Sequence, residues 1–129
     1  MSSSFYNALK LVPVIAVMGI IFFLSQMPGS EIDLPGFAHS DLVAHMIIYA
    51  TLGATILYAW SDRLKNNTPL KIVLSTIIVC FLYGVSDEFH QSFVPGRCVS
   101  AMDICADIVG AMVACVVWWF VCKKSYVNK

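Results

Sequence analysis

The chain has 129 residues, of which 59% are hydrophobic and 12% charged, and its formal net charge is zero. A soluble domain of this size could not bury so many apolar side chains, because small folds leave much of their surface in water. The zero net charge gives no reason to expect a nucleic-acid partner. The composition therefore predicts a membrane protein.

Four apolar segments follow one another along the chain, and each is close to the roughly 20 residues that a helix needs to cross a bilayer. They are uniformly apolar rather than alternating, which favours helices over a barrel. The first is interpreted as a retained span, because its apolar run is long and no A-x-A cleavage site follows. We predict an all-α, polytopic membrane protein, a single domain over 1–129 with four transmembrane helices in a compact bundle, at about 8–27, 42–60, 70–91 and 103–122.

The second predicted span opens with SDLVAHMIIYATLG, which places polar side chains on one face of a helix. Asp41, His45 and Tyr49 follow at intervals of four residues, so they lie one above another. At about 1.5 Å rise per residue, His45 lies about 6 Å deeper than Asp41. We expect these side chains near the boundary between lipid headgroups and hydrocarbon.

The third predicted span ends in SDEFHQSFVPGR, directly after a very apolar run. Asp87, His90 and Gln91 fall on one broad helical face, with Glu88 at its edge. We expect the helix to continue to about Phe93, which also gives it spanning length.

The fourth predicted span opens with SAMDICADIVGAMVA. Ser100 is an N-cap candidate, and Asp103 stands at the third helical position, where an acid favours a helix start. Asp103 and Asp107 lie on the side of the small residues at 106, 110 and 114, a spacing that lets membrane helices approach closely. The two aspartates are therefore expected to face another helix rather than lipid.

The distribution of Lys and Arg between loops predicts the orientation in the membrane. Seven of the eight bases lie at the same ends of the predicted spans, and Arg97 alone lies at the other. The N- and C-termini and the middle loop are therefore predicted to be cytoplasmic. Most of the acids and all three histidines then lie at or near the outer side.

Three helix ends thus bring polar faces to one outer depth, where an unpaired charge facing lipid would cost a few kcal/mol or more. We predict that they converge on one outward-open pocket, lined by Asp41, His45, Asp87, Glu88, His90, Gln91, Arg97, Asp103 and Asp107. Five acids and two histidines would face one arginine there, which is poorly balanced for a purely self-neutralising cluster. The excess acid would bind protons, a divalent metal ion or a cationic group, and Arg97 would anchor a phosphate or carboxylate.

These residues resemble the VanZ-like family of small bacterial membrane proteins. The resemblance runs through FFLSQMPG at 22–29, DLVAHMIIYATLG at 41–53 and SDEFHQSFVPGRCVSAMDICADIVGA at 86–111. The chain has Leu42 where the family usually has lysine and Asp107 where it usually has asparagine, and both differences make the pocket more acidic. The resemblance implies a protein of the bacterial cytoplasmic (inner) membrane and cell envelope. The family's named member is tied to resistance to the glycopeptide teicoplanin.

Three functions remain open. The first is binding or processing of an envelope lipid headgroup, such as that of a lipid-linked cell-wall precursor, or of a glycopeptide. For this function the catalytic candidates are Asp41, His45, Asp87, Glu88 and His90, and the ligand-binding candidates are Tyr49, Gln91, Arg97, Asp103 and Asp107, with a divalent metal as the cofactor to consider.

The second function is that of a non-catalytic assembly module, whose polar residues clamp the helices and whose small-residue face binds a partner. The third is a proton-linked transporter, although the inner halves of the predicted spans offer no ionisable residue for a relay. The residues alone fix neither the metal, the oligomeric state nor whether the protein is an enzyme.

Overall fold

The computed structural model describes residues 3–32, 36, 39–60 and 68–127. Its elements are α1 (Ser3–Leu9), α2 (Val12–Ser25), the 3-10 helix η1 (Gly29–Glu31), α3 (Ser40–Trp60), α4 (Pro69–Gln91) and α5 (Ala101–Val127). Within these residues, four helical stretches are long and apolar enough to cross a membrane, namely Phe5–Ser25, Ser40–Trp60, Pro69–Gln91 and Ala101–Val121. The chain is therefore a multi-pass membrane protein, and the predicted all-α bundle of four spans is confirmed.

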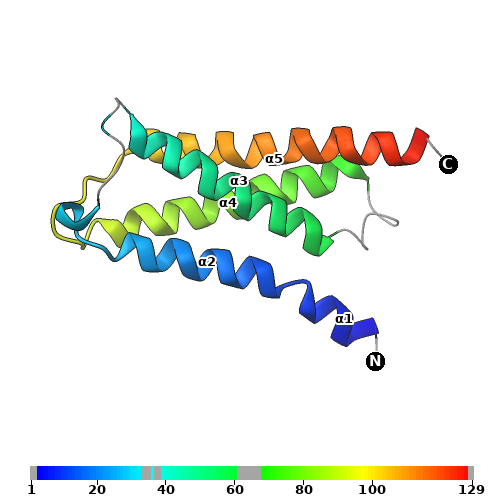
Figure 1. Ribbon diagram of the computed structural model, residues 1–129, viewed down its shortest axis with the longest axis horizontal. Coiled ribbons are helices and arrows are strands. Elements are labelled where there is room, and N and C mark those ends of the chain that lie inside the picture. The colour runs from blue at the N-terminus through cyan, green and yellow to red at the C-terminus, as the bar shows by residue number, and fades with distance from the viewer. Residues whose placement is uncertain (1–2, 33–35, 37–38, 61–67, 128–129) are drawn as a thin grey trace.

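The helices of the bundle run roughly along one direction (Figure 1). The segments that follow α2 and α4 lie at one end, which we call the loop end, and α1 begins and α5 finishes at the opposite end. Large apolar side chains are exposed along the helices, among them Phe23, Ile47, Leu82 and Phe120. Such an apolar exterior is suited to lipid as the surrounding solvent.

The first span is interrupted near Lys10, between α1 and α2. Pro13 stands in the first turn of α2, and a proline has no N–H to donate to the carbonyl four residues earlier. Lys10 is buried, and its ammonium lies 5.9 Å from the ring centre of Tyr6 and 5.6 Å from that of Tyr58 on α3. These cation–π contacts hold the interruption against the end of α3.

The α4 helix continues through the SDEFHQ stretch, as predicted, and ends at Gln91 rather than at about Phe93. A turn with backbone hydrogen bonds follows the helix, and in it the Val94 N–H donates to the Gln91 carbonyl at 2.9 Å. The residue before Pro95 is sterically biased away from helix, which explains the earlier end.

The helices α3 and α5 pack closely through the small residues that the sequence predicts. A Cβ at Gly110 would overlap the carbonyl oxygen of Met46 and would lie 2.9 Å from the backbone nitrogen of Ala50. A Cβ at Gly53 would lie 3.2 Å from that of Ala114. The small-residue face of α5 is thus occupied by α3, so it gives no support to assembly with a partner protein.

Two Pro-Gly loops meet at the loop end. The Gly29 N–H donates to the Pro95 carbonyl at 3.2 Å, and a Cβ at Gly29 would overlap the carbonyl oxygen of Gly96. Gly96 has a φ of 75°, which lies in the left-handed region that favours glycine. This crossing brings the segment after α4 against the end of α2.

Replacing Gly110 by alanine is expected to push α3 and α5 apart and to lower the free energy of unfolding by about 1–3 kcal/mol. Thermal unfolding in detergent or nanodiscs measures this change. Gly19→Ala is the matched control, because nothing lies within 4 Å of a Cβ there. Close packing at Gly110 is contradicted if the two variants unfold alike.

Candidate functional site

A cavity of about 370 Å³ lies at the loop end, lined mainly by α2, α3 and α4. Among the described residues, its apolar lining consists of Ile21, Leu24, Met27, Ile32, Ala44 and Ile48, and its polar lining of Ser25, Glu31, Asp41, His45, Tyr49, Asp87, Gln91 and Arg97. Glu31 and Asp41 are exposed, whereas Asp87 and Gln91 are buried. The volume lies within the range of small-molecule sites, about 300–1,000 Å³.

The carboxylate of Asp87 is held by two donors in the cavity wall. The Ser25 hydroxyl donates to Oδ1, and the Gln91 side-chain amide donates to Oδ2 at 3.1 Å. The same amide lies 3.4 Å from the Ser25 hydroxyl. Because Ser25 ends α2 and Asp87 belongs to α4, this buried network joins two helices. Buried polar groups satisfied in this way rigidify a site.

Sequence reasoning did not single out Ser25 as a site residue. The sequence does place a serine at the end of an apolar span, within FFLSQMPG. This position is at the same predicted membrane depth as the acids of the other spans. A serine is common at helix ends for local reasons alone. The pairing with Asp87 becomes visible only when the neighbouring helix is known.

Arg97 lines the cavity and also closes the end of α2. Its Nε donates to the Met27 carbonyl at 3.1 Å, and Nη2 donates to the Leu24 carbonyl at 2.8 Å. Carbonyls at the end of a helix lack the N–H donors of a following turn, and the guanidinium gives two of them a charged donor. The Leu24 carbonyl also accepts the Met27 N–H at 3.2 Å. A guanidinium has five N–H donors. Among the described residues these two bonds use only some of them, so the remaining N–H groups could bind a ligand.

A second polar region, which we call the inner cluster, lies between α3, α4 and α5 and consists of His45, Glu88, Asp103 and Asp107. His45 Nδ1 lies 2.9 Å from Oδ1 of Asp107, which is fully buried. A Cβ at Gly84 of α4 would lie 2.5 Å from the other oxygen of Asp107. His45 also lines the cavity, so it connects the two regions.

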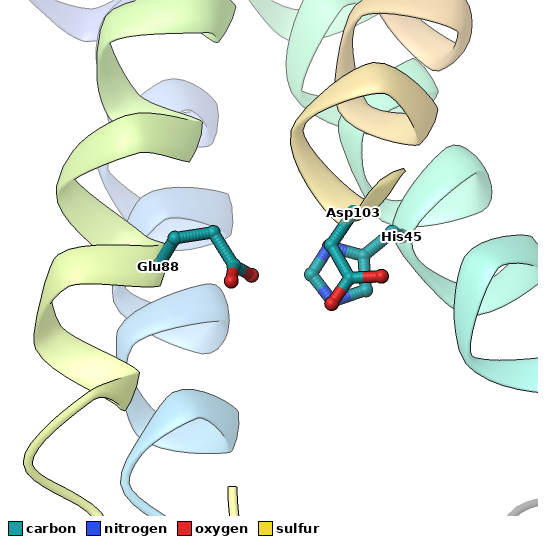
Figure 2. A group of neighbouring side chains, drawn as sticks. All are labelled: His45, Glu88 and Asp103. Atoms are coloured by element: carbon teal, nitrogen blue, oxygen red, sulfur yellow. The ribbon is translucent and has the colours of Figure 1, made fainter. Parts of the chain in front are cut away.

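Glu88 and Asp103 approach His45 from α4 and α5 (Figure 2). One carboxylate oxygen of each and one ring nitrogen of His45 lie within 4.8 Å of one another. Glu88 Oε2 accepts the Ser100 N–H at 2.9 Å, and the Ser100 hydroxyl accepts the Met102 N–H at 3.1 Å. The predicted N-cap role of Ser100 is thus confirmed, and Glu88 supports the same helix start.

Several buried polar atoms in and around these regions have no hydrogen-bond partner among the described residues. They are Tyr49 Oη, Glu88 Oε1, His90 Nε2, Asp103 Oδ1 and Asp107 Oδ2. A buried polar atom left in this state costs about 1–3 kcal/mol, and folded proteins contain few of them. A ligand, an ion or bound protons would satisfy such atoms.

The structure divides the single predicted pocket into two regions and places His90 in neither. Asp41, His45, Tyr49, Asp87, Gln91 and Arg97 line the cavity, and Glu88, Asp103 and Asp107 complete the inner cluster with His45. The His90 ring packs on Phe22 of α2, with ring centres 4.9 Å apart. At about 100° per residue, His90 is turned by about 60° from Asp87, so the two side chains contact α2 at different residues, Phe22 and Ser25.

A protein-family model described as VanZ/LLP1 matches residues 10–122. Among curated proteins, the chain is similar to the uncharacterized protein C11E3.10 of Schizosaccharomyces pombe (strain 972), with 28% identity over 102 residues, which cover 78% of this chain and 59% of that protein. The chain thus spans less than two thirds of that relative's length. No solved structure matches. The family match confirms the resemblance seen in the motifs.

Replacing Arg97 by alanine is expected to lower the free energy of unfolding by about 1–3 kcal/mol, because two carbonyls at the end of α2 lose a charged donor. Lys71→Ala, which removes an exposed cation near the start of α4, is the control. Thermal unfolding of both variants under one condition measures the difference. Equal stability would mean that Arg97 does not hold the end of α2.

Proposed function

The chain belongs to the VanZ/LLP1 family, and from this premise we propose that it binds the headgroup of an envelope lipid in the cavity lined by α2, α3 and α4. The observation that carries the proposal is that apolar and polar side chains together line this cavity. Ile21, Leu24 and Ile48 give it an apolar surface, and residues such as Asp87, Gln91 and Arg97 contribute polar groups. An amphiphilic molecule fits such a lining, because its apolar part can contact the apolar side chains while the polar side chains orient its headgroup.

The polar lining favours a headgroup that carries a phosphate together with hydroxyl or amine donors. Arg97 supplies planar N–H donors that match a phosphate. Glu31 and Asp41 are exposed acids of the lining and would accept hydrogen bonds from sugar hydroxyls or an amine. A lipid-linked cell-wall precursor has this chemistry. If the headgroup is also processed, Asp87 is the buried acid of the lining best placed for proton transfer.

We further propose that the cavity faces the outer leaflet of a bacterial cytoplasmic membrane, with both termini in the cytoplasm. The excess of Lys and Arg at one end of the predicted spans supports this orientation. The start of α1 and the end of α5 share one end of the bundle (Figure 1), and the cavity lies at the other. Lipid-linked precursors present their headgroups at such a membrane surface.

A non-catalytic clamp is the second candidate function, and specific contacts favour it. Arg97 bonds the end of α2, Glu88 bonds the start of α5, and His45 bonds Asp107 from another helix. Each of these contacts joins separate parts of the bundle. A clamp needs no ligand, so the two candidates differ in whether a molecule occupies the cavity.

Replacing Ala44 by leucine is expected to fill part of the cavity and to weaken lipid binding about tenfold, which is about 1.4 kcal/mol, because the larger side chain occupies space that the lipid would fill. Native mass spectrometry of protein released gently from its membrane should show a discrete lipid on the wild type and little on this variant. Ala54→Leu, at an exposed position of the same helix, should retain the lipid.

The bound mass separates the alternatives. A phosphate-containing lipid on the wild type and on Ala54→Leu supports the proposal. Bare wild-type protein together with a destabilised Arg97→Ala variant supports the clamp. Teicoplanin resistance is a further proposal, and we expect Ala44→Leu to lower the inhibitory teicoplanin concentration of cells that depend on this protein, whereas Ala54→Leu leaves it unchanged.

A further inference from the structure

We propose that His45, Glu88 and Asp103 bind one divalent transition-metal ion. Each side chain comes from a different helix, and Figure 2 shows them gathered around one region between α3, α4 and α5. Their ligand atoms lie within 4.8 Å of one another. Ligands of a tetrahedral metal are about 3.4 Å apart when each is about 2.1 Å from the ion. Binding an ion would therefore draw the three ligand atoms closer together than they lie here.

Buried oxygens without partners provide a second, independent indication of a ligand. Glu88 is 2% exposed and Asp103 is 7% exposed. Glu88 Oε1 and Asp103 Oδ1 have no hydrogen-bond partner among the described residues. The remaining oxygen of Glu88 is held by the Ser100 N–H at 2.9 Å, which fixes the carboxylate and leaves Oε1 for the ion.

Asp107 acts on the proposed site as a positioning residue. It lies 2.9 Å from Nδ1 of His45, and an N–H donated there leaves the lone pair of the imidazole on Nε2. Histidines that bind metals commonly donate their other ring N–H to a carboxylate, which fixes the tautomer and raises the basicity of the ligand. Asp107 is fully buried on α5, so it holds this arrangement rigidly.

The charges also favour a divalent ion. Without it, Glu88, Asp103 and Asp107 gather around a single imidazole inside an apolar bundle. A divalent cation neutralises the two carboxylate ligands, which reduces the free-energy cost of burying them. One imidazole with two carboxylates favours Zn²⁺ or Mn²⁺ over Ca²⁺ and Mg²⁺, which prefer oxygen ligands alone.

This inference goes beyond the proposed lipid binding and stands separately from it. His45 lines the cavity and also belongs to the inner cluster, so the ion would lie one side chain away from a bound headgroup. The metal is measured directly, in the absence of any lipid assay. Failure of either proposal therefore leaves the other intact.

The test is a titration of the full chain, purified in detergent and stripped with a chelator, with Zn²⁺ and Co²⁺. We expect the chain to bind one equivalent of Zn²⁺ and to unfold at a higher temperature with metal than without it. Bound Co²⁺ should give an absorption band that disappears when Zn²⁺ replaces it. Glu88→Gln and Asp103→Asn should each weaken binding at least tenfold. Asp107→Asn should weaken it about 10–100-fold and shift the Co²⁺ band.

His39→Ala is the matched control, because it removes an exposed histidine outside the inner cluster and should leave the titration unchanged. The proposal is wrong if the wild type takes up no more Zn²⁺ than the double variant Glu88→Gln, Asp103→Asn. If the variants fail to fold, the titration of the wild type still tests the proposal. The proposed metal site is wrong if the wild type binds no equivalent of Zn²⁺ and shows no Co²⁺ band.

Discussion

The burial of the Asp107 carboxylate governs how three helices meet. This side chain on α5 has no exposed surface, and burying a charge without a partner would cost several kcal/mol. His45 supplies a partner from α3 at 2.9 Å, and Gly84 leaves the necessary space on α4. The register of α3 and α4 against α5 is therefore coupled to one carboxylate. His45 at this junction belongs to the inner cluster and also lines the cavity.

The helix α2 joins the bundle through side chains near its loop end and middle. Ser25 bonds Asp87, Arg97 bonds the carbonyl of Leu24, and the Tyr83 hydroxyl donates to the Met18 carbonyl at 2.7 Å. The helices α3 and α5, in contrast, pack closely because Gly110 has no side chain between them. Ile21 of α2 also belongs to the buried core cluster that contains Tyr49 of α3. The cavity lies between α2 and its neighbours at the loop end.

Most of the fold follows from constraints that the sequence states directly. A bilayer imposes a minimum length on apolar helices, so the spans could be located, although the interruption of the first between α1 and α2 was not predicted. The spacing of small residues around Gly110 predicted close helix packing, and Ser100 predicted the start of α5. Each of these features depends on local chemistry, or on a property that repeats along one helix.

The division of the polar residues could not be predicted in the same way. Asp87 and Glu88 are neighbours about 100° apart on one helix, and that angle does not say which helix faces each of them. Arg97 bonds backbone carbonyls, which every residue carries, so no pattern identifies its partners. His90 shares the helical face of Asp87 yet packs on Phe22. Assigning these roles required the positions of neighbouring helices.

The crossing of the two Pro-Gly loops affects how this family should be compared. The backbones of Gly29 and Gly96 meet with no room for a Cβ on Gly29, and Gly96 also has a left-handed φ. Glycine is the smallest residue, so neither position can be replaced by a smaller residue when the other is replaced by a larger one. A change at one position therefore has no compensating change at its neighbour, and the two columns of an alignment should not covary. Methods that infer contacts from correlated substitutions would miss this pair, although it ties together both loops beside the cavity.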